Sequence, residues 1–282
     1  MPDFSQVLLT VDFDRTLTAP DSSIPQRNIE AIEYFIANGG TFTVNTGRSV
    51  SSFRNYLETL PRNAPLLLYN GSATYDKGQV HDCAVIDLPP VEVLSHMRRL
   101  FPDMNLEVQG ARVHHLVDPS AEFLNLYNTL GWPYEIWQED TDLQPFIKFA
   151  LYGTPRKNAI SDMFQATPQE EQYFLDAAQQ IAQLYAGKVE VFLAAPRIID
   201  VHAKGVSKCT SARALQKKLG KKILVCVGDA QNDVAMLDGA DYAYCPADSI
   251  VSGMYETVCS CGEGAVADVI YKKIPAICEI QP

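Results

Sequence analysis

The segment Val7-Leu8-Leu9-Thr10-Val11-Asp12-Phe13-Asp14 decides the fold of this chain. Its first five residues are apolar or β-branched, which predicts a buried strand, and two carboxylates follow almost at once. Apolar residues at helical spacing come next, over 29–36, and Thr41–Val44 predicts a second buried strand. Strands that alternate with helices in this way predict a parallel sheet with helices on both faces.

The same alternation returns near the end of the sequence. Ile223–Val227 predicts another buried strand, and it ends in Gly228-Asp229. Between these regions, short strands and helices follow one another without regular alternation, which indicates an inserted α+β domain. We therefore predict an α/β fold with a Rossmann-like, doubly wound parallel sheet as its core. The predicted core covers residues 1–83 and 202–282, and the predicted inserted domain covers residues 84–201.

Composition and net charge indicate which kinds of binding partner are disfavoured. The 282 residues are 47% hydrophobic and 20% charged, which is typical of a globular domain with an ample core. The chain has 23 basic and 34 acidic residues, for a net charge of −11. This balance disfavours nucleic acid and anionic membranes, because both attract basic surfaces. The same negative charge would repel an anionic substrate, so a pocket for one would need a bound metal ion and one or two well-placed basic side chains.

The seven cysteines are scattered, and Cys259 and Cys261 form a C-x-C without the second pair of a zinc site. We therefore expect reduced thiols. Asp3 and Asp12 interrupt any apolar leader segment, and no apolar run approaches the ~20 residues that span a bilayer. These features predict a cytoplasmic protein that does not engage a membrane.

Acidic residues follow two of the predicted strands. Asp12 and Asp14 lie after the first, and Asp229 and Asp233 after the later one. Because the carboxyl ends of parallel strands form the sites of open sheets, these carboxylates are expected to converge. A single aspartate at a strand end is more commonly a cap, but two such clusters favour a shared site. Converging carboxylates repel one another unless a hard cation joins them, and oxygen ligands without histidine favour Mg²⁺.

Four short motifs follow one another along the chain. The first is Asp12-Phe13-Asp14-Arg15-Thr16, of the form D-x-D-x-T, and the second is Asn45-Thr46-Gly47-Arg48, at the end of the second strand. The third is Gly205-Val206-Ser207-Lys208, and the fourth is Gly228-Asp229-Ala230-Gln231-Asn232-Asp233, of the form G-D-x-x-N-D. In form and order, these motifs resemble those of the haloacid dehalogenase superfamily. The turn Asn70-Gly71 and the stretch at 262–267 are similar to the Cof-type branch of that superfamily, subfamily IIB. That branch carries a large α+β cap of the C2 type between its second and third motifs.

The resemblance implies a role for each motif residue. Asp12 would attack phosphorus, and Asp14 would act as acid and then as base. Thr46 would bind a phosphoryl oxygen, and Lys208 would neutralise charge. The implied metal ligands for Mg²⁺ are Asp12, Asp14, Asp229 and Asp233. The implied substrate-binding residues are Thr16, Thr46, Gly47, Arg48, Asn70, Lys208 and Asn232.

Some assignments have alternatives. Lys204 competes with Lys208 for the third motif, although the G-V-S-K pattern favours Lys208. Arg48 fits substrate contact and pairing with a core acid equally well. Arg15 replaces the common glycine of D-x-D-G-T and would favour an anionic substrate if it pointed toward the cap. We expect His202 and the pair His114-His115 to be structural or surface groups.

The resemblance implies a Mg²⁺-dependent phosphatase. It would hydrolyse a small soluble phosphomonoester, such as a sugar phosphate or a related metabolite, through an aspartyl-phosphate. One alternative is a sugar phosphomutase, which uses the same pair of aspartates. Another is a non-catalytic, metal-binding regulatory protein on the same fold. Specificity would come from the cap, in which the sequence shows no motif for a particular substrate.

Overall fold

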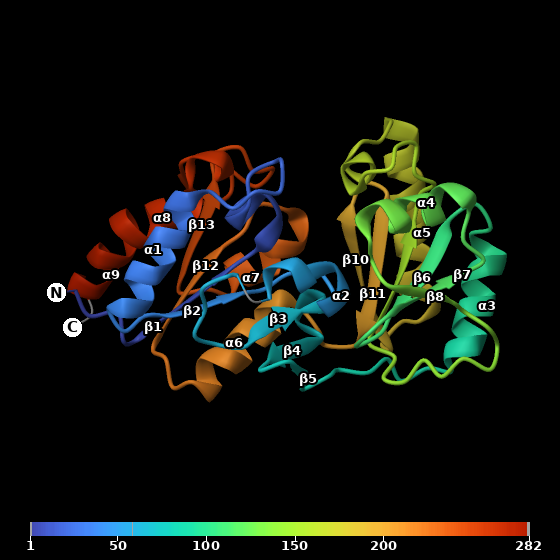
Figure 1. Ribbon diagram of the computed structural model, residues 1–282, viewed down its shortest axis with the longest axis horizontal. Helices are drawn as coiled ribbons and strands as arrows, with labels where there is room; N and C mark the ends of the chain where they lie inside the picture. The colour runs from blue at the N-terminus through green and yellow to red at the C-terminus, as the bar shows by residue number, and fades with distance from the viewer. Residues whose placement is uncertain (1, 58, 281–282) are drawn as a thin grey trace. The chain divides into compact units, whose positions relative to one another are not determined.

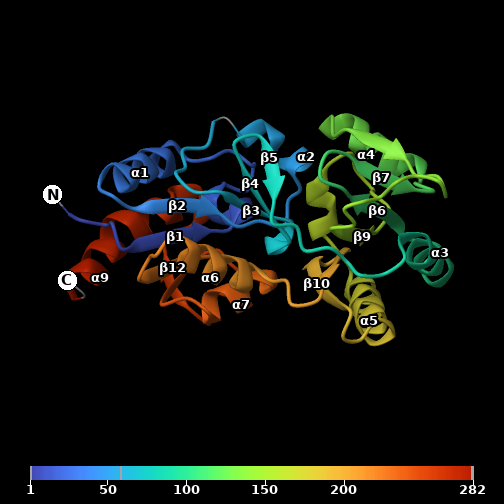
Figure 2. The same ribbon diagram turned by 90° about the horizontal axis from the view of Figure 1, so that it is seen from below.

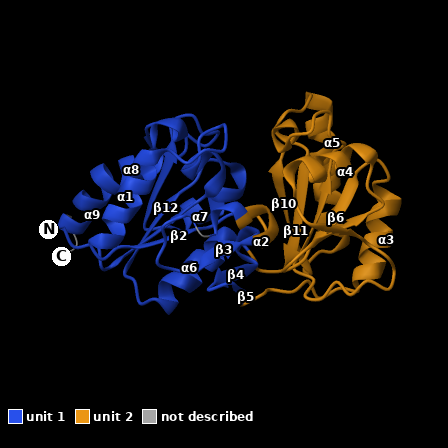
Figure 3. Cartoon of the chain, in the orientation of Figure 1, with its two compact units in different colours: residues 1–47, 55–81, 207–282 blue, residues 48–54, 82–206 orange. Residues whose placement is uncertain are grey.

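A computed structural model describes residues 2–57 and 59–280 of the chain. The structure consists of two compact units, shown in Figure 3. The first unit contains residues 1–47, 55–81 and 207–282, and the second contains residues 48–54 and 82–206. The predicted domain limits place residues 48–54 in the core, whereas the structure groups them with the inserted unit.

The first unit is built on a five-stranded parallel sheet with the order β14-β13-β12-β1-β2. Its strands are β1 (Val7–Val11), β2 (Thr41–Val44), β12 (Ile223–Val227), β13 (Tyr242–Pro246) and β14 (Glu256–Val258). The predicted parallel sheet is therefore confirmed. The short strand β14 was not predicted, because its exposed Glu256 and Thr257 lack the pattern of a buried strand.

Helices cover both faces of this sheet, as Figures 1 and 2 show. They are α1 (Gln26–Ala37), α6 (Lys208–Lys218), α7 (Val234–Asp238), α8 (Ala265–Asp268) and α9 (Ile274–Ile280), with the short turns η6 (Cys261–Glu263) and η7 (Val269–Lys273). Residues of α6 and α7 pack on Leu8 of β1 and Leu224 of β12. Helix α1 lies on the opposite face, where Ile32 and Phe35 are fully buried. The fold is doubly wound, as predicted.

A small antiparallel sheet extends the first unit. It contains β3 (Leu66–Leu68), β4 (Ala73–Asp76) and β5 (Gln79–His81), and the turn η2 (Arg54–Tyr56) lies earlier in the chain. Between β3 and β4, the turn η3 (Tyr69–Gly71) holds Asn70 at φ 53°. Gly71 has φ 92°, and a Cβ there would lie 2.6 Å from the Ser207 carbonyl oxygen. The turn therefore requires glycine and fixes the place of Asn70.

The second unit is built on a six-stranded sheet with the order β10-β11-β9-β6-β7-β8. Its strands are β6 (Asn105–Gln109), β7 (His114–Val117), β8 (Tyr134–Ile136), β9 (Lys148–Tyr152), β10 (Val189–Ala195) and β11 (Ile198–Ala203). Its helices are α2 (Val50–Phe53), α3 (Pro90–Leu100), α4 (Ala121–Leu130) and α5 (Pro168–Leu184), with the turn η4 (Ile160–Phe164). Apolar residues of α3 and α5 pack on one face of the sheet, and residues of α4 pack on the other. The expected α+β character is confirmed.

Residues 48–54 belong to the second unit because polar contacts tie them to it. Ser49 caps α2 and its hydroxyl lies 2.6 Å from His114 Nε2, while the Ser51 hydroxyl donates to the Arg112 carbonyl at 2.9 Å. Arg54 also donates to the Gly131 carbonyl. These three hydrogen bonds, of which the one between Ser49 and His114 is buried, outweigh proximity in sequence to β2.

A buried polar network lies beneath α4. Glu107 accepts a hydrogen bond from Tyr152 at 2.8 Å and further bonds from Tyr127 and Gln109. His114 Nδ1 lies 2.7 Å from the Tyr127 hydroxyl. Burial raises the pKa of Glu107 to about 7, and burial lowers the pKa of His114 to about 3. His114 is therefore a structural group, one of the two expected options, and it is neutral when the protein is folded.

Glu107→Gln is expected to reveal opposing pH effects within this network. Between the ordinary pKa of glutamate, 4.5, and about 7, folded Glu107 keeps a proton that the unfolded chain releases, so its contribution to stability falls as pH rises. His114 acts in the opposite direction between about 3 and 6.5, because only the unfolded chain binds the proton. The two effects oppose each other between pH 4.5 and 6.5. In the variant, the free energy of unfolding should therefore rise more steeply with pH, by roughly 1 kcal/mol per pH unit.

Urea denaturation of both proteins at several pH values between 4.5 and 6.5 measures this difference. Glu122→Gln, an exposed glutamate on α4, serves as the control and should leave the slope unchanged. Parallel pH profiles for Glu107→Gln and the unmodified protein would contradict the prediction.

All seven cysteines lie in the described part of the chain and are free thiols, as expected. Among the described residues, the helices do not combine the length and apolar character that crossing a bilayer requires.

Candidate active site

The end of β1 forms the first part of the site. The Asp12 amide continues the sheet by donating to the Val227 carbonyl at 2.8 Å, and the chain then enters a wide helical turn, η1 (Phe13–Leu17). Within this turn Arg15 has φ 61°, a conformation that costs an L-residue roughly 1 kcal/mol. The glycine that Arg15 replaces would adopt this conformation without that cost. Burial and Asp233 raise the pKa of Asp229, and the exposed Arg15 side chain is one of the smaller contributions that oppose this rise.

The end of β12 supplies the second part. Asp229 follows the strand, and Asp233 ends the turn η5 (Gln231–Asp233). Asp233 Oδ2 accepts from the backbone amides of Asp229 and Ala230, both at 3.0 Å. A Cβ at Gly228 would lie 2.6 Å from the Asp233 Cβ, so only glycine allows this approach. The motif spacing thus folds Asp233 back onto the strand end.

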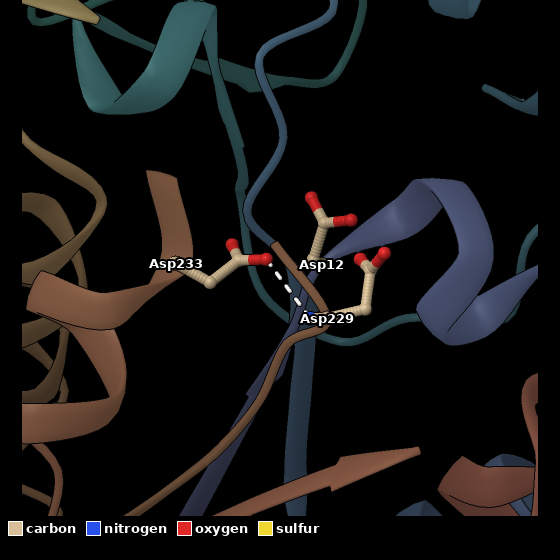
Figure 4. A group of neighbouring side chains, drawn as sticks. All are labelled: Asp12, Asp229 and Asp233. Carbon is tan, nitrogen blue, oxygen red and sulfur yellow. Dashed lines mark hydrogen bonds between the residues drawn. The ribbon is translucent and has the colours of Figure 1, made fainter. Parts of the chain in front are cut away.

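Three carboxylates converge at these two strand ends, as Figure 4 shows. Asp12, Asp229 and Asp233 are buried, and each offers an oxygen within 4.8 Å of the others. The Asp14 side chain is less buried and does not belong to this group of three. Of the four acids that the sequence predicted to converge, the structure brings three together.

Lys208 is the basic residue of this group. Its Nζ lies 2.5 Å from Asp12 Oδ1 and 2.6 Å from Asp233 Oδ1, and its side chain is 1% exposed. Lys208 opens α6, where the helix dipole disfavours a cation, so the two carboxylates account for its position. Lys204 instead pairs with Glu190 at 2.7 Å in the second unit and is 58% exposed. Lys208, rather than Lys204, lies with the acids.

Charge in the group is unbalanced. Burial, followed by Asp233 and Asp229, raises the pKa of Asp12, although Lys208 opposes this shift. Burial and Asp233 raise the pKa of Asp229 to about 7. Burial alone would lower the pKa of Lys208, but Asp12 and Asp233 outweigh it and raise that pKa. One ammonium group thus faces three carboxylates, and a cation with oxygen ligands would relieve their repulsion.

The remaining predicted residues of the first unit contact Asp229 or one another. The Thr16 hydroxyl donates to Asp229 Oδ1 at 2.9 Å, and the backbone N–H of Asn70 donates to the Thr46 carbonyl at 2.9 Å. Asn232 Nδ2 lies 3.5 Å from Asn70 Oδ1, at the limit of a hydrogen bond. A Cβ at Gly47 would lie 2.9 Å from Asn70 Oδ1, so a glycine at this position leaves room for the side-chain amide of Asn70.

Arg48 belongs to the second unit, where its guanidinium donates to the Ser52 carbonyl at 3.1 Å. This contact fixes part of the side chain and leaves both of its predicted roles untested.

Sequence reasoning gave no role to Asn45, although it is fully buried. Its Nδ2 donates to the Lys208 carbonyl at 2.8 Å and to the Ser211 hydroxyl at 3.2 Å. Asn45 thereby ties the end of β2 to the first turn of α6, which carries Lys208. The sequence signal that could have identified Asn45 is its position directly after a buried strand. A polar side chain that is buried there needs a hydrogen-bond partner.

The family follows from comparison with known proteins. The model of the haloacid dehalogenase-like hydrolases matches residues 9–250 of the sequence. The chain belongs to the haloacid dehalogenase-like hydrolases. A Streptococcus pyogenes protein named as a phosphatase is 26% identical over 234 residues, which cover 82% of this chain and 83% of that protein. The HMP-PP phosphatase of Serratia proteamaculans is 25% identical over 236 residues, or 82% of this chain and 80% of that protein.

Solved structures of other proteins share the fold. A Streptococcus mutans protein matches with a TM-score of 0.78 and 18% identity, covering 93% of this chain and 97% of that one. A structure described as a subclass IIB sugar phosphatase matches with a TM-score of 0.69, 18% identity and the same coverage. The predicted family, α/β fold and enzyme class, a haloacid dehalogenase-type phosphatase, are therefore confirmed.

Proposed function

We propose that this haloacid dehalogenase-like hydrolase cleaves small phosphomonoesters, such as sugar phosphates or related metabolites, through an aspartyl-phosphate on Asp12. The observation that carries the proposal is the buried group in which Lys208 joins Asp12 to Asp233 beside Asp229. A buried group of this kind costs stability, which favours a catalytic purpose. The names of the sugar phosphatase and the HMP-PP phosphatase support a small substrate.

The chemistry of the acidic group fits Mg²⁺. Asp12, Asp229 and Asp233 supply only oxygen atoms, lie within reach of one ion and carry more charge than Lys208 neutralises. We propose that Asp12 and Asp229 hold the ion with the Asp14 backbone carbonyl, and that Asp233 ligates it directly or orients its ligands. When bound, Mg²⁺ would offset charge on the phosphoryl group.

The proposed reaction has two steps. In the first, an Asp12 oxygen bonds to phosphorus, the bond to the ester oxygen breaks, and Asp14 gives that oxygen a proton. In the second, Asp14 takes a proton from water as the water oxygen attacks phosphorus, and the bond to Asp12 breaks. Thr46 would donate to a phosphoryl oxygen, and Lys208 would offset its negative charge. Inorganic phosphate and the regenerated Asp12 carboxylate are the products of the second step.

A panel of phosphorylated metabolites, assayed with Mg²⁺ for release of inorganic phosphate, tests the function. We expect turnover of several small monoesters. Isomeric sugar phosphate formed without inorganic phosphate would instead indicate a phosphomutase, and inactivity toward the whole panel would contradict the proposal.

Chelation of divalent ions is expected to abolish turnover, and added Mg²⁺ should restore it. Asp229→Asn should raise the Mg²⁺ concentration for half-maximal rate by about tenfold or more, because a neutral amide is a weaker ligand for a hard cation. Mg²⁺ titrations of the rate measure this shift. Glu256→Gln removes a carboxylate that is 58% exposed and paired with Lys273, and it serves as the control. An unchanged Mg²⁺ requirement in Asp229→Asn would exclude this residue as a ligand.

A further inference from the structure

Asn45, directly after β2, is a buried residue whose side-chain amide is only partly satisfied. The residue is fully buried, and its Oδ1 accepts no hydrogen bond from the described residues. Desolvating an amide is costly unless both of its polar atoms find partners. An apolar side chain at this position would avoid that cost. The polar contacts that Asn45 does make therefore need a reason other than stability.

Those contacts converge on the backbone of Lys208. Asn45 Nδ2 lies 2.8 Å from the Lys208 carbonyl oxygen and 3.2 Å from the Ser211 hydroxyl oxygen. A carbonyl can only accept, so the first contact fixes the orientation of the amide. The Ser211 hydroxyl donates to the same carbonyl at 3.1 Å. Two side chains thus hold the backbone of the residue whose Nζ lies between Asp12 and Asp233.

The backbone of Asn45 is itself fixed to the sheet. Its N–H donates to the carbonyl of Val11, the residue before Asp12, at 2.9 Å. Asn45 also forms a parallel bridge with Leu67 of β3, and the N–H of Thr46 donates to the Leu67 carbonyl at 2.9 Å. The side chain of Asn45 therefore connects the strand ends next to Asp12 with the helix that carries Lys208.

Apolar packing does not place the first turn of α6 with the same accuracy. Ala212 and Leu215 of α6 pack in the core with Leu8 and Leu224, and the attraction between apolar groups is non-directional. Lys208 reaches the carboxylates on a flexible four-carbon stem, so the place of its Nζ depends on where the helix begins. A hydrogen bond to the Lys208 carbonyl is directional, and it fixes that place.

We propose that Asn45 is a positioning residue, which holds the first turn of α6 so that the Lys208 ammonium group stays between Asp12 and Asp233. The inference rests on the proposed role of Lys208 at the phosphoryl group. Misplacing a reacting group by about 1 Å can cost about 100-fold in rate. An unsatisfied Oδ1 is tolerated for this purpose, because active sites commonly sacrifice stability for activity.

Asn45→Ala tests the effect on the reaction. We expect kcat for the best substrate to fall about 10–100-fold and KM to change less than about threefold, because Lys208 acts on charge in the transition state. A thermal melt shows the temperature range in which the variant is folded, and the rates are measured within that range. Unchanged kcat in Asn45→Ala would overturn the inference.

Asn63→Ala is the matched control for this variant. The Asn63 side chain holds the opposite end of β2, where it accepts from the Phe42 N–H at 2.8 Å and donates to the Gly40 carbonyl at 2.9 Å. Its loss removes an amide bonded to the backbone of the same strand without touching α6. We expect kcat of Asn63→Ala to stay within about twofold of the unmodified enzyme. Equal falls in kcat for the two variants would overturn the inference.

A cycle of urea denaturation experiments tests whether Asn45 acts through Lys208, and it requires no turnover. Lys208→Met should lower the urea midpoint of the unmodified chain when Mg²⁺ is absent. In Asn45→Ala the same substitution should lower the midpoint by less than about half as much, because coupled residues have non-additive effects. In Asn63→Ala it should have its full effect. Equal losses in all three backgrounds would overturn the inference.

The urea cycle also separates this inference from the proposed function. Inactivity toward every phosphate ester would defeat the proposed function, while the cycle would still show whether Asn45 holds Lys208 in place. If Asn45→Ala fails to fold, Ser211→Ala replaces it, because it removes the other side-chain donor to the Lys208 carbonyl. The same fall in kcat and the same non-additivity with Lys208→Met are then required, and additive losses would overturn the inference.

Discussion

Replacing Asp12 by asparagine is expected to lower turnover of the best substrate by about 10⁴-fold or more. The amide cannot form the bond to phosphorus, and the proposed mechanism offers no other nucleophile. Folding should survive, because Lys208 retains Asp233 at 2.6 Å and the variant relieves repulsion among three buried carboxylates. The rate at saturating substrate and a thermal melt measure the two effects.

Covalent labelling gives this prediction a second readout. Acid quenching during turnover of radiolabelled phosphate ester should leave label on the unmodified chain and none on Asp12→Asn. Asp238→Asn is the matched control. Asp238 lies on α7 and its carboxylate accepts a hydrogen bond from the Tyr255 hydroxyl, so this variant should carry as much label as the unmodified chain. Activity of Asp12→Asn within tenfold of the unmodified enzyme would refute the proposed nucleophile.

Lys208→Met is expected to lower the free energy of unfolding by roughly 3–5 kcal/mol when Mg²⁺ is absent. The change leaves Asp12 and Asp233 buried without the ammonium group that lies within 2.6 Å of both. Urea denaturation measures the loss. Mg²⁺ should recover part of it, since an ion held by the same carboxylates replaces the missing charge and stabilises the folded state. Turnover should fall strongly even with Mg²⁺ present, because the proposed phosphoryl contact is gone.

Lys204→Met provides the comparison for this variant. Lys204 is 58% exposed and pairs with Glu190, so its loss should cost less than about 1 kcal/mol. If Lys208→Met proved as stable as Lys204→Met in chelator, the ammonium group would not be what holds the carboxylates together.

Local signals explain why much of the core was predictable. Val7–Val11 and Ile223–Val227 contain apolar residues and, in the first, one β-branched threonine, and both form fully buried parallel strands at the centre of the sheet. Burial on both faces leaves such strands without polar alternation, so the pattern is readable in the sequence. The acids that follow these strands converge because parallel strands end at the same edge.

The central strand β6 shows where local signals fail. Asn105–Gln109 alternates polar and apolar residues, which usually marks a strand with one face in water, yet all five residues are buried. Glu107 is tolerated there because Tyr127 and Tyr152 donate to it from distant parts of the sequence, in addition to Gln109 on the same strand. Partners 20 and 45 residues away cannot be deduced from the strand itself.

The sequence by itself determined the parallel sheet, the two acidic strand ends and the family, because each depends on short motifs and buried apolar runs. Tertiary structure alone decided which groups meet. It brought Lys208 to Asp12 across 196 positions, excluded Lys204 from that group and tied residues 48–54 to the second unit through His114. It also aligned Gln109, Lys148 and His202 across three strands. The physical reason is that the energies of buried charges and hydrogen bonds depend on partners distant in sequence, whereas strand and helix patterns depend on neighbours.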